Sequence, residues 1–407
     1  MNDCDVIVVG GGPAGILAAY TAAQGGARVV LLEKNEKLGK KLYITGKGRC
    51  NVTNDCDADE FRRNVVHGER FLYSALSHWS PRDTADFLES RGVPVKAERG
   101  NRVFPASDKS SDVIKALTVA LQGAGVDVRL HTPVTAVLVH DSAVTGVKTT
   151  DLLFNATKVI VATGGLSYPL TGSTGDGYRF AKALGHTLVP PVPALCALVV
   201  AERDDLEGLS LKNVTVSYTD GKCSYASEIG EMLFTDDGVS GPLILTLSSY
   251  INTKMSGNGI LRIDLKPALT EAQLDARLLR DFAAEPNKQL KNSLFDLLPR
   301  RLISVIIERA KVNPELPINV LPREGRLRLV QALKGLPFTV LKAADIETAV
   351  VTAGGVSTAE INPKNMESKR VKGLHFCGEV LDIDALTGGF NIQLALATGR
   401  AAGQPAV

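Results

Sequence analysis

The sequence predicts an α/β fold in which one domain, built from both ends of the chain, is interrupted by an insert of different character. Strand-like and helix-like segments alternate over residues 1–190 and again over residues 344–407, and together they predict the outer domain. Short strands separated by turns over residues 191–266 predict a small antiparallel β unit, and residues 267–343 predict a helical unit. Three prolines within Pro190–Pro193 mark the first boundary.

The composition limits the classes of function. The chain has 407 residues, 44% of them hydrophobic, and a formal net charge of +2. It is long enough for several domains, and it lacks the strong positive charge of a protein dedicated to nucleic acid or anionic membranes. Six cysteines without a C-x-x-C pair predict neither a metal site nor a disulfide framework. No segment resembles a signal peptide or a membrane span, so we expect a cytoplasmic protein without a membrane partner.

The first turn of the chain carries the most informative motif. The strand-like run Val6–Val9 precedes Gly10-Gly11-Gly12-Pro13-Ala14-Gly15 and an alanine-rich helix, and a second strand, Arg28–Leu32, ends at Glu33 and Lys34. A strand, a G-x-G-x-x-G turn, a helix, a strand and a terminal acid form a dinucleotide-binding unit of the Rossmann type. The glycines allow the turn, the approach of a pyrophosphate and close helix packing, and Glu33 can accept the hydroxyls of an adenosine ribose.

Caps and periodicity predict the remaining elements of the outer domain. Ser80 is an N-cap and Pro81 a first helical residue, so a helix is predicted over Ser80–Arg91. A second helix is predicted over Ser111–Gly123 and a last one over Asn391–Ala402. Predicted strands are Val126–Leu130, Val134–His140, Lys158–Ala162, Thr348–Thr352 and Gly373–Cys377.

The insert shows first the period of strands and then that of helices. Its predicted strands are Leu195–Val200, Val214–Tyr218, Lys222–Ser227, Leu243–Leu247 and Ile260–Leu265. Thr270 is a candidate N-cap, and residues Thr270–Arg309 are predicted to be helical, followed by a further helix over residues 323–334.

Two segments in the first half of the chain help to decide whether the dinucleotide is NAD or FAD. The loop Gly39–Asn51 is rich in glycine, and its basic residues Lys40, Lys41 and Arg49 can neutralise a pyrophosphate. The predicted strand before Thr163-Gly164 ends in small residues, which let a cofactor pass close to the backbone.

The C-terminal segment favours FAD. A predicted strand ends at Gly378-Glu379, where the carboxylate can accept the ribityl hydroxyls of FAD. The helix that starts near Asn391 would direct its N-terminal N–H groups at the flavin ring and stabilise negative charge on the reduced form. A nicotinamide enzyme has no use for this returning segment.

Several motifs together resemble those of the BaiN-type, aminoacetone-oxidase-like FAD-dependent oxidoreductases. The motifs are the loop from Lys41 through Thr45–Asn54, Thr352–Val356, Gly378–Asp382 with Thr387–Asn391, and Phe234–Pro242 in the insert. The resemblance implies a Rossmann-type, glutathione-reductase-like FAD domain whose insert contains a small antiparallel β-barrel-like unit and a helical unit. Asp236 stands where we expect a histidine in this family, and Cys377 stands where alanine is common.

The motifs and the resemblance together give a set of candidate cofactor residues. These are Gly10, Gly12, Pro13, Ala14, Gly15, Glu33, Lys34, Lys41, Thr45, Gly46, Gly48, Arg49, Cys50, Asn51, Val134, Thr163, Gly164, Gly378, Glu379, Asp382, Gly389, Phe390 and Asn391. No catalytic acid or base is identified, and Arg49, Cys50 and Asn51 are the candidates for groups near the ring. A Cys50 thiolate stabilised by Arg49 and Lys47 is one hypothesis, and a packing role for Cys50 is the other.

The expected function is that of an FAD-dependent oxidoreductase with a small-molecule substrate. Hydride would pass through flavin N5 between NAD(P)H or an oxidisable small molecule and an organic acceptor or oxygen. NADH or NADPH is a possible transient donor, because no second G-x-G-x-x-G follows a strand. Two alternatives stay open: a flavin-dependent enzyme that modifies nucleic acid, and a flavin-binding sensor or scaffold without turnover. The near-neutral net charge argues against a nucleic-acid partner.

Overall fold

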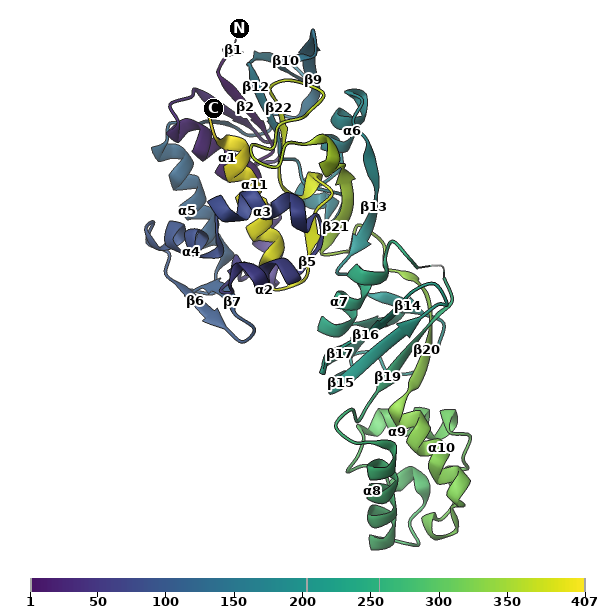
Figure 1. Ribbon diagram of the computed structural model, residues 1–407. Helices are drawn as coiled ribbons and strands as arrows, with labels where there is room; N and C mark the ends of the chain where they lie inside the picture. Colours follow the sequence, from purple (N-terminus) through teal and green to yellow (C-terminus); the bar gives the residue numbers. More distant parts are fainter. Residues whose placement is uncertain (1, 203, 256, 406–407) are drawn as a thin grey trace. The chain divides into compact units, whose positions relative to one another are not determined.

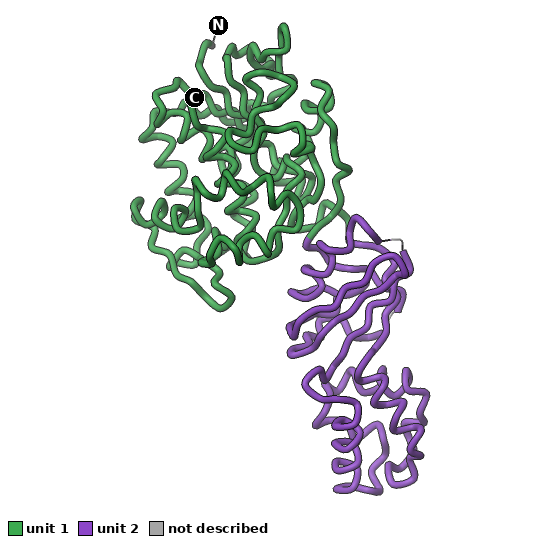
Figure 2. The backbone as a smooth tube through the Cα atoms, in the orientation of Figure 1, with its two compact units in different colours: residues 1–194, 345–407 green, residues 195–344 purple. Residues whose placement is uncertain are grey.

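The computed structural model describes residues 2–202, 204–255 and 257–405, and the chain forms two compact units. Unit 1 comprises residues 1–194 and 345–407, and unit 2 comprises residues 195–344 (Figure 2). Each unit contains a hydrophobic core of its own. The α/β fold interrupted by an insert, which the sequence predicts, is confirmed.

A parallel five-stranded sheet lies at the centre of unit 1. Its strand order is β22-β12-β2-β3-β8. The strands are β2 (Val6–Val9), β3 (Val29–Leu32), β8 (Asp127–Arg129), β12 (Lys158–Val161) and β22 (Leu374–Phe376). β2 and β3 are buried along their whole length, as expected for strands covered on both faces. Because β22 comes from the C-terminal segment, the sheet itself joins the two ends of the chain.

Helices from both ends of the chain complete unit 1, and the helix that follows β2 packs directly on this sheet (Figure 1). They are α1 (Pro13–Gln24), α2 (Ala58–Arg63), α3 (Glu69–His78), α4 (Pro81–Glu89), α5 (Ser110–Gly123), α6 (Asp176–Ala183) and α11 (Phe390–Gly403). The approach of α1 and α11 is close, because a Cβ on Gly399 would lie 2.2 Å from the carbonyl oxygen of Ala14. α4 begins with a capping box between Ser80 and Asp83, which confirms the predicted start.

The remaining strands of unit 1 form four smaller sheets. One contains β1 (Asn2–Asp3), β11 (Leu153–Asn155), β10 (Ala143–Thr149) and β9 (Val134–His140), and another contains β4 (Thr53–Asn54), β7 (Arg102–Pro105) and β6 (Val95–Glu98). The pairs are β13 (Leu188–Ala194) with β21 (Val351–Val356), and β5 (Val65–His67) with β23 (Asp384–Ala385). Short 3-10 helices are η1 (Leu42–Gly48), η2 (Pro169–Thr171), η5 (Thr358–Glu360) and η6 (Gly378–Val380).

The proline-rich segment that marks the predicted boundary is itself a strand. Pro190, Pro191 and Pro193 lie in β13, which pairs with β21 in an antiparallel register that is irregular between Val189 and Val192. Proline has no N–H to donate, and it is tolerated in such a two-stranded edge. The first segment of unit 1 ends with this strand, at Ala194.

A closed β-sheet forms one part of unit 2. Its strands are β14 (Leu198–Val200), β15 (Ser210–Thr219), β16 (Ser224–Ala226), β17 (Gly230–Phe234), β18 (Gly238–Ser240), β19 (Gly259–Asp264) and β20 (Leu336–Ala343). They follow the order β16-β15-β17-β18-β14-β20-β19, and an additional β15–β19 pairing closes the circle. The sheet is therefore a small antiparallel barrel.

Four helices complete unit 2 and share its hydrophobic core with the barrel. They are α7 (Pro242–Ile251), α8 (Glu271–Ala284), α9 (Arg300–Arg309) and α10 (Arg323–Lys334), with 3-10 helices η3 (Leu290–Asn292) and η4 (Ile318–Val320). The predicted helix over residues 323–334 is confirmed. No helix among the described residues has the length and apolar character to cross a lipid bilayer.

The predicted strand Leu243–Leu247 is wrong, because these residues lie inside α7. Pro242 occupies the first helical position after Gly241, which is a strong start signal for a helix. A short apolar run fits a buried strand and a buried helix equally well, so periodicity alone did not separate them.

The predicted helical character of Thr270–Arg309 holds for its two ends but not for the residues between them. Thr270 does cap α8, through a capping box with Gln273. The chain leaves the helix after Ala284 and re-enters one only after Pro299. Pro286 and Pro299 lack the N–H that an interior helical residue donates, so the segment contains two helices and a connecting loop.

Candidate functional site

The turn between β2 and α1 leaves an open space in front of a helix N-terminus. Gly10 has φ +107°, and a Cβ on it would lie 2.5 Å from the carbonyl oxygen of Ala162. A Cβ on Gly15 would lie 1.9 Å from the oxygen of Gly10, whereas nothing lies within 4 Å of the Cβ position of Gly12. Gly12 is the N-cap and provides no side-chain cap. The free N–H groups of the first turn therefore face open space, which suits a phosphate.

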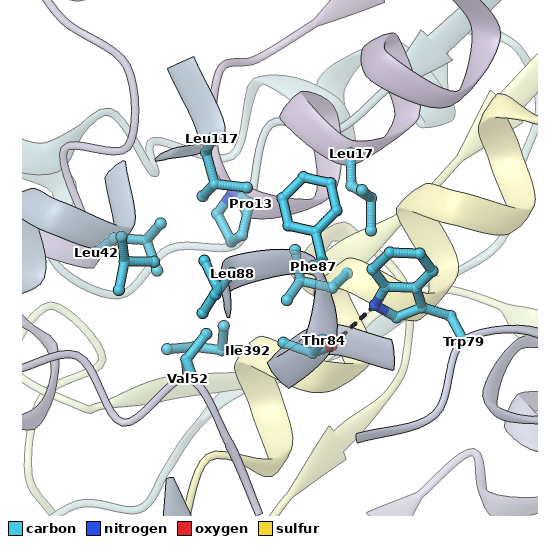
Figure 3. Close-up of a pocket in the computed structure, with 12 residues that line it drawn as sticks. Pro13, Leu17, Leu42, Val52, Trp79, Thr84, Phe87, Leu88, Leu117 and Ile392 are labelled. Atoms are coloured by element: carbon cyan, nitrogen blue, oxygen red, sulfur yellow. Dashed lines mark hydrogen bonds between the residues drawn. The ribbon is translucent and has the colours of Figure 1, made fainter. Parts of the chain in front are cut away.

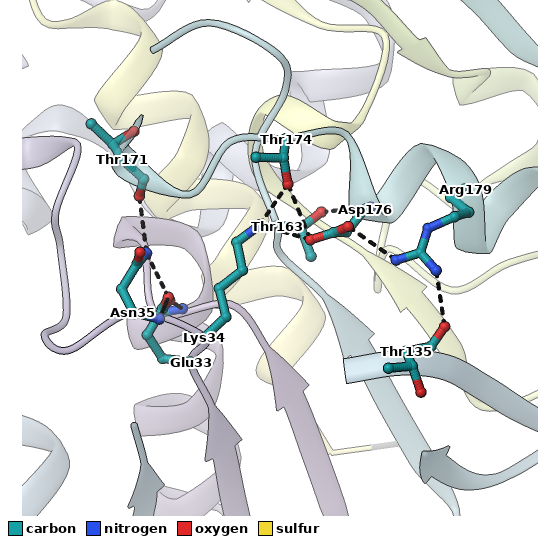
Figure 4. Close-up of polar contacts among 11 residues, drawn as sticks. Glu33, Lys34, Asn35, Thr135, Thr163, Thr171, Thr174, Asp176 and Arg179 are labelled. Carbon is teal, nitrogen blue, oxygen red and sulfur yellow. Dashed lines mark hydrogen bonds and ion pairs between the residues drawn. The ribbon is translucent and has the colours of Figure 1, made fainter. Parts of the chain in front are cut away.

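Glu33 lies beside this turn with its carboxylate held in place (Figure 4). Its Oε2 accepts the backbone N–H of Gly11 at 2.6 Å, and its Oε1 accepts the backbone and side-chain N–H groups of Asn35, both at 2.8 Å. Asn35 also donates to the carbonyl oxygen of Thr171 at 3.0 Å. The terminal acid of the predicted βαβ unit is thus fixed next to the glycine turn, where a ribose would follow a pyrophosphate.

Lys34 extends the site toward the start of α6 (Figure 4). Its Nζ lies 2.6 Å from the hydroxyl of Thr174 and 2.7 Å from Oδ2 of Asp176. Arg179 contacts the other oxygen of Asp176 at 3.0 Å and donates to the carbonyl oxygen of Thr135 at 3.1 Å. Burial acts against ionisation of Asp176, but the hydrogen bonds from Lys34 and Arg179 hold its pKa below the ordinary value.

Lys41 and Glu379 join the two ends of the chain in one polar cluster. The Nζ of Lys41 contacts both carboxylate oxygens of Glu379, at 2.8 and 3.0 Å, and the hydroxyl of Ser167 at 2.6 Å. Glu379 also accepts the backbone N–H of Thr352 at 2.9 Å. A Cβ on Gly164 would lie 3.9 Å from Oε2 of Glu379. Four segments with separate sequence motifs therefore meet here, and they contain Lys41, Gly164, Thr352 and Glu379.

The loop after Lys41 has a left-handed backbone at several positions. Gly46 and Gly48 have φ +56° and +86°, and Lys47 and Cys50 have φ +58° and +60°. Left-handed residues turn the chain sharply and place the following segment against β7, where the N–H of Val52 donates to Val103 at 2.9 Å. The hydroxyl of Thr45, in the same loop, donates to the carbonyl oxygen of Leu42 at 2.8 Å.

The structure does not support a thiolate at Cys50. The residue is fully buried, and burial raises the pKa of its thiol to about 11. Arg49, expected to stabilise the thiolate, instead contacts Asp108 at 2.6 Å and Glu98 at 2.5 Å. Its guanidinium lies 4.1 Å from the centre of the Phe104 ring. The charge of Arg49 is thus already compensated, and Cys50 packs as a neutral side chain.

The start of α11 is fixed against the end of the same loop. A Cβ on Gly389, which has φ +96°, would lie 2.2 Å from the carbonyl oxygen of Thr53. Asn54 donates to the carbonyl oxygen of Gly388 at 3.0 Å. Asn391 donates to the carbonyl oxygen of Ala385 at 2.7 Å. The Oδ1 of Asn51 is buried without a hydrogen-bond partner among the described residues, so this corner contains an unsatisfied acceptor.

The other predicted residues lie around these contacts. Gly378 has φ +77°, and a Cβ on it would lie 2.8 Å from the Cβ of Ala14. Thr163 accepts the N–H of Gly177 at 3.1 Å, and Val134 is buried at the start of β9. Phe390 stacks edge-to-face on Phe61, with 5.0 Å between the ring centres.

A His–Asp pair next to this region is missing from the sequence-based candidates. The Nδ1 of His67 lies 2.5 Å from Oδ1 of Asp384. His67 has no metal-ligand spacing to another histidine, and 317 positions separate it from Asp384. The available signal was the acidic pair Asp382 and Asp384 inside a glycine-rich segment. No group of three or more potential metal ligands occurs within the described ranges.

A small cavity beneath the glycine turn is apolar (Figure 3). It is lined by Pro13, Leu17, Leu42, Val52, Trp79, Thr84, Phe87, Leu88, Val113, Leu117, Ile392 and Leu396. Thr84, its one hydroxyl-bearing residue, accepts the indole N–H of Trp79 at 2.8 Å. Such a lining attracts neither phosphate nor water, so this cavity belongs to the core behind the site.

Comparisons with known proteins show the family and the fold of the chain. A family model described as "HI0933-like protein Rossmann domain" matches residues 4–405. The 3-dehydro-bile acid delta(4,6)-reductase of Clostridium scindens is 32% identical, over 98% of both chains. The ribosomal RNA dihydrouridine synthase of Haemophilus influenzae is 31% identical, over 97% of this chain and 96% of that protein. Among solved structures, the 3-ketosteroid-delta4-(5alpha)-dehydrogenase of Rhodococcus jostii shares the fold, with a TM-score of 0.54 at 17% identity over 99% of this chain and 96% of that chain.

Proposed function

The chain belongs to the HI0933-like family of Rossmann-domain proteins, and from this premise we propose that it reduces a carbon–carbon double bond conjugated to a carbonyl group. The protein is an FAD-dependent oxidoreductase. The proposal adds the class of substrate, the electron donor and the residues that hold the cofactor.

The contact between Lys41 and Glu379 carries the proposal. It connects the loop after the N-terminal βαβ unit to the C-terminal segment, so the glycine turn, Glu33 and the start of α11 belong to one site. That site offers free N–H groups, a fixed carboxylate, and an open Cβ position at Gly12. These features fit the pyrophosphate and ribose of FAD.

The residues have separate roles in this proposal. The turn Gly10–Gly15 holds the pyrophosphate, Glu33 accepts the ribose hydroxyls, and Lys41 with Glu379 holds the polar chain that leads to the flavin. The N-terminal N–H groups of α11 stabilise negative charge at the flavin ring. FAD, when bound, supplies two-electron hydride chemistry through its N5 atom. NADH or NADPH is the proposed donor.

Two full-length relatives support the class of substrate. One is named as a delta(4,6)-reductase of a bile acid and the other as a synthase of dihydrouridine. Each name describes addition of hydrogen across a double bond in a ring. A small conjugated ketone is the leading substrate class for this chain.

The test has two stages. Purified protein is titrated anaerobically with NADH or NADPH, and loss of flavin absorbance measures reduction. The reduced protein is then mixed with 2-cyclohexen-1-one or 4-androstene-3,17-dione, and return of the absorbance measures reduction of the double bond. We expect bleaching by one nucleotide and reoxidation by at least one ketone. Protein that bleaches but is reoxidised only by oxygen would contradict the proposal.

Uracil in ribosomal RNA is the second candidate substrate, because the Haemophilus influenzae relative covers nearly the whole chain. The basic side chains of the insert give it little support. Arg326 is paired with Asp275 at 2.6 Å, and Arg328 donates to the carbonyl oxygen of Ala310 at 2.9 Å. Salt-dependent binding of ribosomal RNA, together with dihydrouridine formation detected by mass spectrometry, would favour this candidate over the first.

A further inference from the structure

The His67–Asp384 pair joins two short strands that meet beside the candidate site. His67 ends β5 and Asp384 begins β23, and the two residues are direct partners in the antiparallel pairing. The Nδ1–Oδ1 distance is 2.5 Å, which is short for a hydrogen bond between an imidazole and a carboxylate. An ionised carboxylate can only accept, so in a hydrogen bond to the carboxylate form the proton is on Nδ1.

The carboxylate of Asp384 lies in an unusual environment for a charged group. Its side chain is fully buried, and Oδ2 has no hydrogen-bond partner among the described residues. A buried carboxylate with only one satisfied oxygen costs stability, so His67 is the group that compensates its charge. The side chain of His67 is 34% exposed, so the same ring also reaches solvent.

Asp384, one member of the pair, lies within the C-terminal segment that contributes to the candidate site. Asp384 stands between Asp382 and the start of α11 at Phe390. The side chain of Asn391 folds back onto this strand, because its Oδ1 accepts the N–H of Ala385 at 2.9 Å. A Cβ on Gly68, the residue after His67, would lie 3.2 Å from the carbonyl oxygen of Asp382. Burial raises the pKa of Asp382, with His67 lowering it and Asp384 raising it further.

We propose that His67 donates the proton that accompanies hydride addition to the substrate double bond, and that Asp384 is its positioning residue. This inference rests on the proposed function. One carbon of the double bond receives hydride, whose two electrons come from NADH or NADPH, and the other carbon receives the proton from Nε2. Overall, the π bond, the Nε2–H bond and the nicotinamide C–H bond that supplies the hydride break, two C–H bonds form, the nucleotide is oxidised to NAD⁺ or NADP⁺, and the neutral ring regains a proton from solvent.

The kinetic test separates the two half-reactions in the holoenzyme. In His67→Gln, bleaching by NADH or NADPH and reoxidation by oxygen should stay within about twofold of wild type, since neither protonates carbon. Reoxidation by 2-cyclohexen-1-one should slow by about 10²–10⁴-fold, the range for loss of a general acid. The matched control is His140→Gln, which removes an exposed histidine 3.2 Å from Asp141 and should change nothing.

The outcomes separate this inference from the proposed function. If His67→Gln is reoxidised by the ketone as fast as wild type, His67 is not the proton donor, although the protein is still a double-bond reductase. If wild type itself is not reoxidised by the ketones, the proposed function fails and this inference fails with it. Bound FAD and the melting temperature of each variant show whether the fold is intact.

A second readout needs no turnover. Nitrogen-15 NMR of the imidazole in cofactor-free protein reports which ring nitrogen carries the proton, and the His67→Gln spectrum assigns the signal. We expect a proton on both ring nitrogens of His67 in wild type, and loss of one of them in Asp384→Asn, where no carboxylate compensates the charge of the ring. Addition of FAD should move the His67 signal and leave that of His140 in place. A His67 ring without a proton on Nδ1, or one insensitive to FAD, would overturn the inference.

Discussion

The Nζ of Lys41 lies 2.8 Å from Oε2 of Glu379, although 338 positions separate the two residues in the chain. Ser167 completes the cluster, because its hydroxyl donates to Oε1 of Glu379 at 3.0 Å. Both charged side chains are about one-fifth exposed, so the pair is only partly screened by water. It joins the loop after the N-terminal βαβ unit to the C-terminal segment of unit 1.

Replacing Lys41 should remove this ion pair and lower the stability of unit 1. In Lys41→Met the carboxylate of Glu379 keeps its N–H and hydroxyl donors but loses the opposite charge. We expect the free energy of unfolding of the cofactor-free protein to fall by about 1–2 kcal/mol, less than for a fully buried pair. Lys40→Met is the matched control: Lys40 pairs with the half-exposed Glu36, and its loss should cost less than about 0.5 kcal/mol. Urea denaturation measures both, and equal losses would contradict the expectation.

Glu33 should be sensitive to loss of its charge alone. Three N–H groups converge on its two oxygens, and a glutamine there would direct its own NH₂ at one of them. In Glu33→Gln we expect FAD affinity to fall at least about tenfold, the equivalent of roughly 1.4 kcal/mol for one disrupted charged hydrogen bond. Glu36→Gln is the control: Glu36 is half-exposed and pairs with Lys40, so its loss should leave FAD affinity unchanged. Fluorescence titration of the cofactor-free variants with FAD gives both values, and unchanged affinity in Glu33→Gln would contradict the role of Glu33.

Local signals in the sequence were sufficient for much of unit 1. The glycine turn, the Ser80 cap and the acid at the end of β3 act within a few residues of one another, and each lies where its pattern predicts. Short-range chemistry is visible in a sequence because both partners are neighbours. The strand predicted at Leu243–Leu247 is wrong for a local reason as well, since Gly241 and Pro242 directly before it favour the start of a helix.

Contacts between distant segments were not accessible in this way. Nothing near Arg49 indicates that Glu98 and Asp108 compensate its charge, and nothing near His67 indicates Asp384. The sequence shows which residue types are present, but the fold decides which of them meet. For that reason Cys50 was a plausible thiolate in the sequence, whereas it is a buried neutral thiol in the structure.

Cys50 should be inert at neutral pH. Its thiol pKa is raised from 9.0 to about 11, so the folded state retains the proton more strongly than the unfolded chain does. The resulting stabilisation is complete below pH 9 and is lost as the pH rises toward 11. We expect iodoacetamide at pH 8 to label the partly exposed Cys223 in native protein before the fully buried Cys50, as measured by peptide mass spectrometry. Cys50→Ser should retain turnover, and its loss together with rapid labelling would restore the thiolate hypothesis.

The glycines of the first turn should separate cofactor binding from folding. A Cβ at Gly12 meets nothing within 4 Å, whereas a Cβ at Gly15 would lie 1.9 Å from the carbonyl oxygen of Gly10. Gly12→Val should therefore leave the melting temperature of the cofactor-free protein within about 2 °C of wild type, because a substitution in open space costs at most about 0.5 kcal/mol. Its larger side chain would fill the space in front of α1, so the purified variant should retain less than about a tenth of the FAD of wild type.

Gly15→Ala should instead destabilise the cofactor-free protein by more than about 2 kcal/mol, because backbone must move to admit the methyl group. Thermal unfolding and the flavin absorbance of purified protein measure both effects; a Gly12→Val variant that purifies with full FAD would show that the cofactor does not cross this turn.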